Sequence, residues 1–282
     1  MARYESNFAR RLTPGTILLN IVALFIILSF LAPIIWIFTS SLKTSSQAVS
    51  IPPVWFFKPQ FEGYKELFLK ENFLRYLLNS IAVSGITLVI AMVFGFPAAY
   101  ALARYNIRRK EDIAFWMLSL FMLPPLTVMF PYVILFKTFH LMDTHLVLII
   151  AHLTFVLPLA IWLLQRFIKE MPIEVEEAAD LDGANVFQKM ILVVLPYIRS
   201  GFVATVLLCF IFSWNNFIFT LFLAPYRART LPAAAMGLVS YVSLNWNKIT
   251  GGISIILLPP ILITLLAQRS FAKGMRGLAG LK

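Results

Sequence analysis

The chain has 282 residues, of which 60% are hydrophobic and 13% charged, and its 24 Lys and Arg exceed its 13 Asp and Glu to give a net charge of +11. Soluble domains average about 45–50% apolar and about 25% charged residues, so a water-soluble fold could not bury this much apolar surface. The composition therefore excludes the soluble classes and predicts an integral membrane protein.

Six long apolar stretches contain no Asp, Glu, Lys or Arg. Each has about the 20 residues that a helix needs to cross a hydrocarbon core roughly 30 Å thick. None alternates apolar with polar residues, as spanning β-strands do. We therefore predict an all-α integral membrane protein with six transmembrane helices, in a single domain over residues 1–282. The predicted spans are 17–38, 77–102, 113–136, 146–164, 201–224 and 249–267.

The basic residues predict the orientation of these spans. With six spans, both termini share one side of the membrane with the second and fourth loops, and that side holds 15 of the 24 Lys and Arg. The densest cluster lies in the short loop at 104–110. The positive-inside rule places this side, and both termini, in the cytoplasm. Since the basic residues lie beside spans and form no patch on a soluble fold, we predict no nucleic-acid binding.

Prolines lie inside five of the six stretches. We single out Pro33, Pro97, Pro124, Pro125, Pro158, Pro259 and Pro260. Each removes a backbone donor and clashes with the preceding turn, so we predict kinks or breaks in these helices. Kinked helices are common in transporters, but membrane bundles tolerate proline in any case, and both interpretations stay open.

The loop at 170–196, on the predicted cytoplasmic side, is unusually structured for a connection. It holds six of the 13 acidic residues. Pro172 is typical of a helix start, and Gly183 supplies the permissive backbone that ends a helix. Asn185 then predicts the N-cap of a second short helix that runs to Leu195. We expect a helix-turn-helix that lies against the membrane, with a solvated acidic loop as the alternative.

The spacing of residues in this loop favours the structured alternative. Its fixed positions are Glu177, Ala178, Ala179, Gly183, Val193, Leu195 and Pro196. They resemble the EAA-x3-G-x9-I-x-LP signature of ABC-importer permeases, with Val193 in place of Ile as a conservative departure. The pattern is specific, because several residues recur at fixed offsets and the motif lies about 90 residues before Lys282.

The rest of the chain resembles the carbohydrate-uptake branch of these permeases, the family of the maltose and glycerol-3-phosphate permeases. The stretches that carry the resemblance are LLNS at 77–80, PAAYALARY at 97–105, EEAADLDGAN at 176–185, SWNNF at 213–217 and QRSFAKGMRGLAGLK at 268–282. In relatives the second Asn of WNNF is often acidic, so Asn216 is a departure, and its effect on substrate choice is open.

The resemblance implies a type I ABC importer permease fold and a division of labour among subunits. The helix around Glu177 and Gly183, with Asp182, is expected to be a coupling helix that docks on a cytoplasmic ATPase dimer. ATP and Mg²⁺ are expected in that ATPase, so this chain is expected to be no enzyme, with no catalytic residue and no bound cofactor. The sequence contains no Gly-x4-Gly-Lys-Ser/Thr phosphate loop. Other implied partners are a second homologous permease and an extracytoplasmic solute-binding protein, in a bacterial inner membrane.

Polar residues in the fifth predicted span are candidates for a substrate pathway. They are Ser213, Trp214, Asn215 and Asn216. Polar groups inside a span are costly unless they face protein or water, so amides that bond sugar hydroxyls and an indole that stacks on a sugar ring are one interpretation. Hydrogen bonding between helices, or a place near the outer interface, is the other. The histidines His140, His145 and His152 match no zinc spacing, so we expect no metal site.

We predict a permease subunit of an ATP-driven, binding-protein-dependent sugar importer. The spans contain no acidic residue, which favours a neutral substrate and counts against a proton- or ion-coupled carrier. Two alternatives are kept. One is an ABC permease for a non-sugar solute such as a polyamine or phosphate, and the other is a secondary transporter or channel that works alone.

Overall fold

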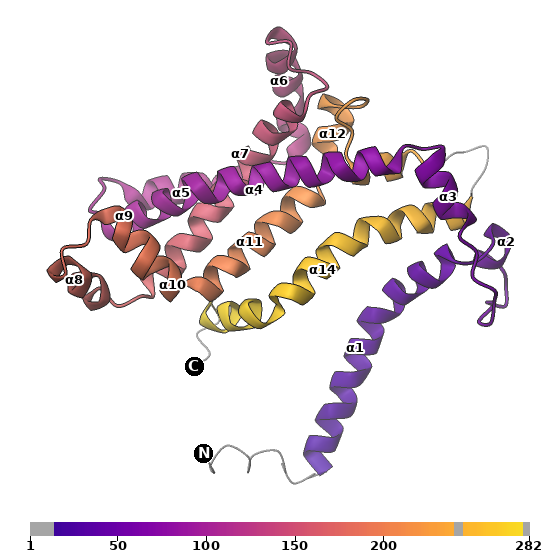
Figure 1. The fold of residues 1–282 in the computed structure, drawn as a ribbon, viewed down its shortest axis with the longest axis horizontal. Helices are drawn as coiled ribbons and strands as arrows, with labels where there is room; N and C mark the ends of the chain where they lie inside the picture. Colours follow the sequence, from indigo (N-terminus) through magenta and orange to yellow (C-terminus); the bar gives the residue numbers. More distant parts are fainter. Residues whose placement is uncertain (1–13, 240–244, 279–282) are drawn as a thin grey trace.

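The computed structural model describes residues 14–239 and 245–278, which form an elongated bundle of helices (Figure 1). The short helices α2 and α3 lie at one end of the bundle, and α8 to α10 lie at the other. The helices are α1 (Pro14–Ser41), α2 (Ser45–Ala48), α3 (Glu62–Leu69), α4 (Phe73–Arg104), α5 (Lys110–Met122), α6 (Pro125–Thr138), α7 (His145–Lys169), α8 (Glu174–Leu181), α9 (Val186–Gln188), the π-helix η1 (Lys189–Val194), α10 (Leu195–Tyr197), α11 (Arg199–Trp214), α12 (Ile218–Leu223), α13 (Leu231–Met236) and α14 (Trp246–Leu278).

The core of the bundle is formed by α4, α7, α11 and α14. Two contacts show that α4 and α7 run parallel. Asn79 Oδ1 lies 2.8 Å from His145 Nε2 near the starts of the two helices. Near their ends, Gln165 Nε2 donates to the carbonyl of Leu102 at 3.3 Å. Helix α11 packs antiparallel to α7, with Ser213 beside His152. This arrangement brings the ends of α4, α7 and the start of α11 together beside α8.

Four of the predicted spans are continuous helices, and four described helices have the length and apolar character to cross a membrane. These are α1, α4, α7 and α14, each of which extends beyond its apolar stretch. A bent helix pair that ends with α11 would raise the number to five. The predicted count of six transmembrane helices is therefore not confirmed, although the all-α membrane class is.

The third and fifth predicted spans are interrupted. Helix α5 ends at Met122 and α6 begins at Pro125, so the predicted span 113–136 is two helices. Pro124 and Pro125 cannot donate the backbone bonds that would continue α5. The predicted span 201–224 divides at 215–217 into α11 and α12, with no proline at the break. Of the other prolines, Pro33, Pro97, Pro158, Pro259 and Pro260 lie inside the continuous helices, and Pro131 lies inside α6.

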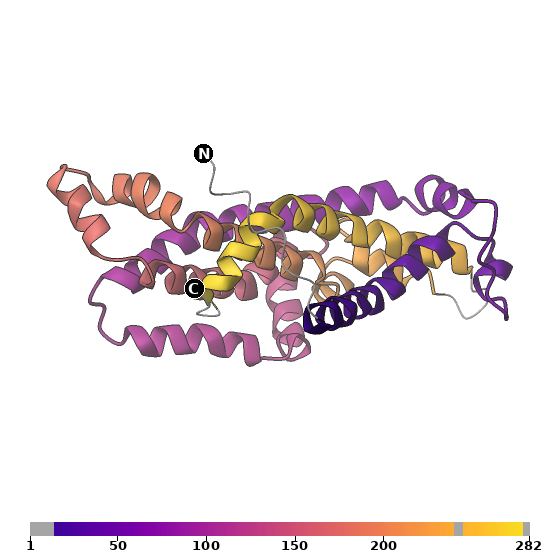
Figure 2. The ribbon, with the colours of Figure 1, turned by 90° about the horizontal axis from the view of Figure 1, so that it is seen from below.

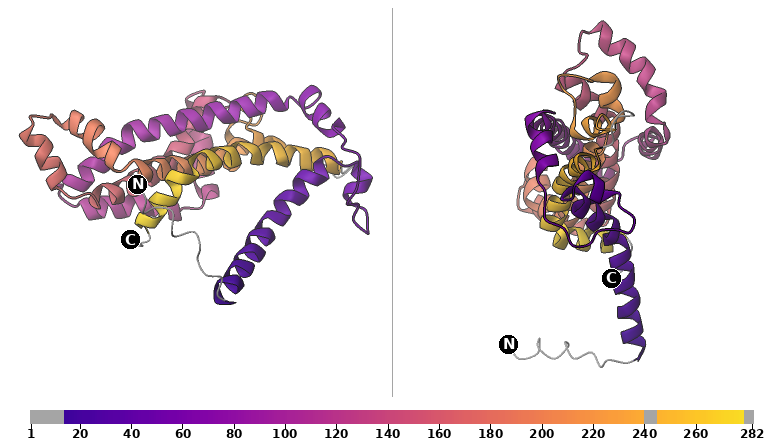
Figure 3. Two further views of the ribbon diagram at one scale, coloured as in Figure 1. Left: turned by 60° about the horizontal axis from the view of Figure 1, so that its bottom comes forward. Right: turned by 90° about the vertical axis from the view of Figure 1, so that its right-hand side faces the viewer.

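Helix α1 stands away from the bundle along most of its length (Figure 3). No residue of its most apolar stretch is buried. Its last turn is held at the end of the bundle, where Ser41 Oγ and Tyr64 Oη are 2.7 Å apart. A helix that is apolar all round and uncovered requires lipid or another protein around it.

The LLNS stretch holds a loop at the α3 end of the bundle. Asn79 Nδ2 donates to the carbonyls of Arg227 and Arg229, at 3.1 and 2.9 Å, and Ser80 Oγ accepts from the amide of Leu231 at 2.7 Å. Side chains near the start of α4 thus satisfy backbone groups of the 224–231 loop. This contact accounts for two polar residues at the beginning of an apolar helix.

Gly201 lies where α11 packs closely against α7. A β-carbon at this position would lie 2.3 Å from the ring of Phe167. We expect Gly201→Ala to lower the free energy of unfolding by about 1–3 kcal/mol, because the ring must shift in a packed interface. Gly85→Ala is the matched control, since Gly85 also lies within a helix but has no atom within 4 Å of its β-carbon position. Thermal unfolding of the purified proteins measures both, and equal melting temperatures would contradict the packing.

Candidate functional site

The predicted loop helix is α8, which ends at Leu181, and the turn that closes it contains Gly183 as expected. Gly183 has φ +81°, and its N–H donates to the carbonyl of Asp180 at 3.0 Å while the N–H of Ala184 donates to Ala179 at 3.0 Å. This pair of bonds is the Schellman motif that closes helix ends. Any other residue at this φ would be strained by about 1–2 kcal/mol, which explains the glycine.

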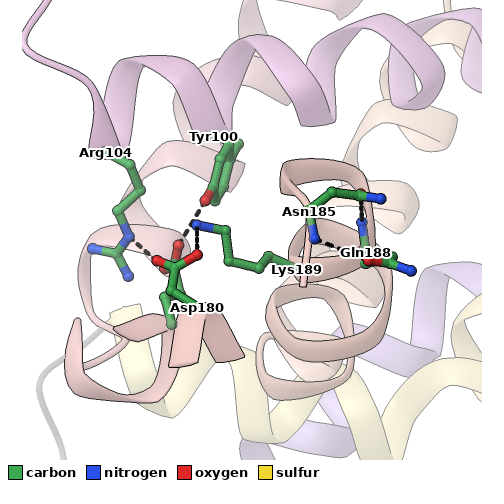
Figure 4. Close-up of polar contacts among 7 residues, drawn as sticks. Tyr100, Arg104, Asp180, Asn185, Gln188 and Lys189 are labelled. Atoms are coloured by element: carbon green, nitrogen blue, oxygen red, sulfur yellow. Dashed lines mark hydrogen bonds and ion pairs between the residues drawn. The ribbon is translucent and has the colours of Figure 1, made fainter. Parts of the chain in front are cut away.

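The second helix of the loop begins at Asn185, which also confirms the prediction. Asn185 Oδ1 accepts from the N–H of Gln188 at 2.9 Å, and Gln188 Oε1 accepts from the N–H of Asn185 at 2.9 Å, so the two residues form a capping box (Figure 4). The helix continues through η1 into α10. Pro196 has no N–H for an α-helical bond, and the wider π-helical turn lies directly before it.

A buried cluster holds α8 against the end of α4. Glu176 is only 3% exposed, and its carboxylate accepts from Arg104 Nε at 2.6 Å and from Tyr100 Oη at 2.7 Å. The Arg104 guanidinium also donates to the carbonyl of Met171 at 2.9 Å. Tyr100 and Arg104 are four residues apart, so both lie on the same face of α4 (Figure 4). The buried carboxylate is therefore both paired and hydrogen-bonded.

A second ion pair joins α8 to η1. Lys189 Nζ lies 2.7 Å from Asp180 Oδ1, and Figure 4 shows the Lys189 side chain reaching back toward α8. Asp180 is about half exposed, so this pair contributes little to stability by itself. Together with the Schellman motif, it sets the angle between the two helices of the loop.

The outer face of the loop exposes apolar and acidic side chains together. Leu181 is 91% exposed, Phe187 71% and Leu192 69%. Glu177 and Asp182 are exposed on the same segment. Large apolar side chains that are exposed beside charged ones are typical of a surface that binds another protein.

The structure brings three of the seven predicted coupling residues, Ala179, Asp182 and Gly183, together around one cavity. Asp182 and Gly183 line a cavity of about 320 Å³, with Ala179, Ala184, Gln188, Leu192 and Val193. Ala178 and Glu177 are exposed on α8, whereas Leu195 is half-buried and Pro196 exposed, at the start of α10. The loop therefore has an inner face, fixed by Glu176, and an outer face that carries Glu177.

Sequence reasoning missed the residues that anchor the loop. Glu176, Arg104 and Tyr100 all lie within stretches that carried the family resemblance. The spacing of Tyr100 and Arg104 on one face of a helix was a signal for a shared partner. Nothing local distinguished Glu176 from Glu177, because both are helix-forming carboxylates in the same turn.

The four candidate substrate residues divide into two pairs. Ser213 Oγ lies 2.8 Å from His152 Nδ1, and Trp214 Nε1 donates to the carbonyl of Ile256 at 3.1 Å, so both face other helices. Asn215 and Asn216 lie at the break between α11 and α12 and line a cavity of about 350 Å³. Asn216 Oδ1 also accepts from the N–H of Phe219 at 3.3 Å, at the start of α12. For the first pair the geometry is that of helix-to-helix hydrogen bonds.

Comparisons with known proteins agree on a transport family. Residues 91–277 match the family described as binding-protein-dependent transport system inner membrane component. The chain is 34% identical over 275 residues to the trehalose transport system permease protein SugB of Mycobacterium tuberculosis, covering 95% of this chain and 97% of that protein. It is 27% identical to the trehalose/maltose transport system permease protein MalG of Thermococcus litoralis, covering 93% and 92%.

One solved structure has the same fold. A chain of a bacterial ABC transporter involved in the import of the acidic polysaccharide alginate matches with a TM-score of 0.74, covering 91% of this chain and 96% of that one. The sequence identity is 20%, so the match concerns the fold alone.

Proposed function

Because this chain belongs to the family of binding-protein-dependent transport system inner membrane components, we propose that it is one permease subunit of an ATP-driven sugar importer in a bacterial inner membrane. The chain forms half of the translocation pathway and is not itself the ATPase. ATP and Mg²⁺ bind to a cytoplasmic ATPase dimer, and an extracytoplasmic binding protein delivers the sugar.

The observation that carries this proposal is the loop of α8 to α10. Its inner face is fixed to α4 by Glu176, while its outer face exposes Leu181 and Glu177. A helix that is rigidly attached on one side and apolar and charged on the other fits a docking element for the ATPase. Motion of the ATPase would reach the spans through the contact of Glu176 with Arg104.

A second, homologous permease subunit is supported by α1. This helix is apolar all round, and its most apolar stretch has no buried residue. Figures 1 and 3 show the helix leaning away from the other spans. We propose that the partner permease covers one side of α1 and lipid covers the other.

A sugar as the substrate is supported by two independent observations. Several relatives, such as the trehalose permease of Mycobacterium tuberculosis, are named for sugars. The spans also contain no carboxylate that would bind a cationic solute. A non-sugar solute is the alternative, and thermal-shift screening of the binding protein with sugars, polyamines and phosphate separates the two.

The proposed function is tested by whether an ATPase co-purifies with the chain and drives uptake. A tagged chain is expected to co-purify with an ATPase and a second permease, and proteoliposomes loaded with ATP are expected to take up sugar only when the binding protein is added. Uptake by the chain alone, driven by a proton or sodium gradient, would instead establish a secondary transporter. Without any ATPase partner the proposal fails.

Both termini are proposed to lie in the cytoplasm, on the side of α8. The sequence has one cysteine, Cys209. In a Cys209→Ser background, a cysteine at Ser46, which is exposed in α2, is expected to react with a membrane-impermeant thiol reagent in whole cells. A cysteine at Asn106, exposed between α4 and α5, is expected to stay unlabelled until the cells are opened. If only Asn106→Cys were labelled in whole cells, the orientation would be the opposite of the one proposed.

Asn215 and Asn216 are proposed to contact the sugar from the break between α11 and α12. We expect Asn215→Leu to raise the KM for uptake about threefold to tenfold, because one hydrogen bond contributes about 0.5–1.5 kcal/mol. The control is Ser29→Ala, which removes an exposed hydroxyl of α1 that bonds only within its own helix. Radiolabelled uptake by the assembled transporter measures KM, and equal values for both variants would remove Asn215 from the pathway.

A further inference from the structure

We propose that an anionic phospholipid binds in an apolar groove between α5 and α7, with its phosphate held by the basic residues at the start of α5. The groove has a volume of about 580 Å³. Its lining consists of Arg109, Asp112, Ile113, Trp116, Met117, Leu120, Leu157, Pro158 and Ile161. The proposal requires only that the chain lies in a membrane and is independent of the proposed transport function.

The length of the groove matches one leaflet of a bilayer. Arg109 and Leu120 are eleven positions apart along α5, which corresponds to about 16 Å of helix. Half of a hydrocarbon core is about 15 Å. A single acyl chain that begins beside Arg109 would therefore reach the level of Leu120 near the middle of the membrane.

The groove is apolar inside and charged only at its mouth. Seven of its nine lining residues are apolar, and both charged ones, Arg109 and Asp112, lie at the start of α5. Helix α5 runs along the outside of the bundle, where lipid can reach it (Figure 2). Trp116 is 70% exposed on this side, and an indole near the headgroup level is typical of a membrane interface.

The charge at the mouth favours an anionic headgroup. Arg108, Arg109 and Lys110 form no ion pair with any residue that the structure describes, and the first two are exposed. Glu111 is paired with Lys169 at 3.8 Å. Asp112 is then the carboxylate that opposes three cations at the mouth. A basic pocket between helices at the membrane surface is a site for acidic headgroups.

The test uses the purified full-length chain in phosphatidylcholine nanodiscs that contain either brominated phosphatidylglycerol or brominated phosphatidylcholine. Bromine quenches nearby indoles, and the difference between the wild-type chain and Trp116→Phe isolates the signal of Trp116. We expect the groove to bind phosphatidylglycerol about fivefold more tightly than phosphatidylcholine. One basic residue near the surface contributes about 1 kcal/mol, which corresponds to this ratio.

Two variants separate the headgroup from the acyl chain. Arg108→Gln/Arg109→Gln is expected to abolish the preference, whereas Lys58→Gln/Lys65→Gln, which removes the same charge from exposed positions at the other end of the bundle, is expected to keep it. Leu120→Phe narrows the groove and is expected to reduce quenching of Trp116 by both lipids.

Three results would overturn the proposal. Equal quenching by the two lipids in the wild-type chain means that the groove has no headgroup preference. A preference that survives in Arg108→Gln/Arg109→Gln means that other charges cause it. Loss of quenching by both lipids when the second permease is present means that the groove is a subunit interface. Each result leaves the ATP dependence of transport unaffected, so the two proposals fail separately.

Discussion

Replacing Glu176 by alanine is expected to release α8 from α4 and to abolish uptake. The change leaves the guanidinium of Arg104, whose side chain is 13% exposed, without its carboxylate. Removing one partner of a buried ion pair costs about 3–5 kcal/mol, more than a short helix gains from its own backbone. Faster hydrogen exchange of the α8 amides, relative to those of α7, measures the release directly.

The compensating change distinguishes a buried pair from a general loss of structure. In Arg104→Met/Glu176→Leu no charge remains uncompensated, and we expect most of the protection of α8 to return. Glu177→Ala is the matched control in the same helical turn, and it should leave hydrogen exchange unchanged because that side chain is exposed. If the α8 amides exchange at the same rate in Glu176→Ala and Glu177→Ala, the cluster does not hold the loop.

Replacing Glu177 by lysine is expected to leave the chain folded, unlike Glu176→Ala, but to stop it from coupling to the ATPase. The Glu177 side chain forms no ion pair within the residues that the structure describes. Removing the carboxylate of a charge pair that is buried across an interface costs about 2–5 kcal/mol, because the other charge is left unpaired, and charge reversal adds repulsion. We expect normal membrane insertion and thermal stability, but loss of the co-purified ATPase or of ATP-dependent uptake.

Glu111→Lys is the control for charge reversal on the same side of the membrane. Glu111 is 76% exposed and 3.8 Å from Lys169, a surface pair of small energetic value. Its reversal should lower uptake only slightly. Equal uptake by Glu177→Lys and Glu111→Lys would mean that α8 is a solvated acidic loop and that the coupling assignment is wrong.

The sequence by itself determined the features that depend on near neighbours. The four continuous spans follow from uninterrupted apolar runs, since a helix in lipid satisfies its own backbone groups. The loop helices follow in the same way, because the turn at Gly183 and the capping box of Asn185 involve residues within five positions of each other. The division of the third predicted span at Pro124 and Pro125 belongs to this class too, since proline acts on its own turn.

Only the tertiary structure decided which residues and segments pack against one another. Glu176 and Glu177 are identical in local chemistry, yet consecutive residues of a helix point about 100° apart, so α4 can bury only one of them. The partner that selects Glu176 is Arg104, 72 positions earlier in the chain. The break at 215–217 and the departure of α1 from the bundle likewise depend on surfaces from distant segments. Apolar runs specify that a segment is buried in lipid or protein, but not which one, because both are equally free of water.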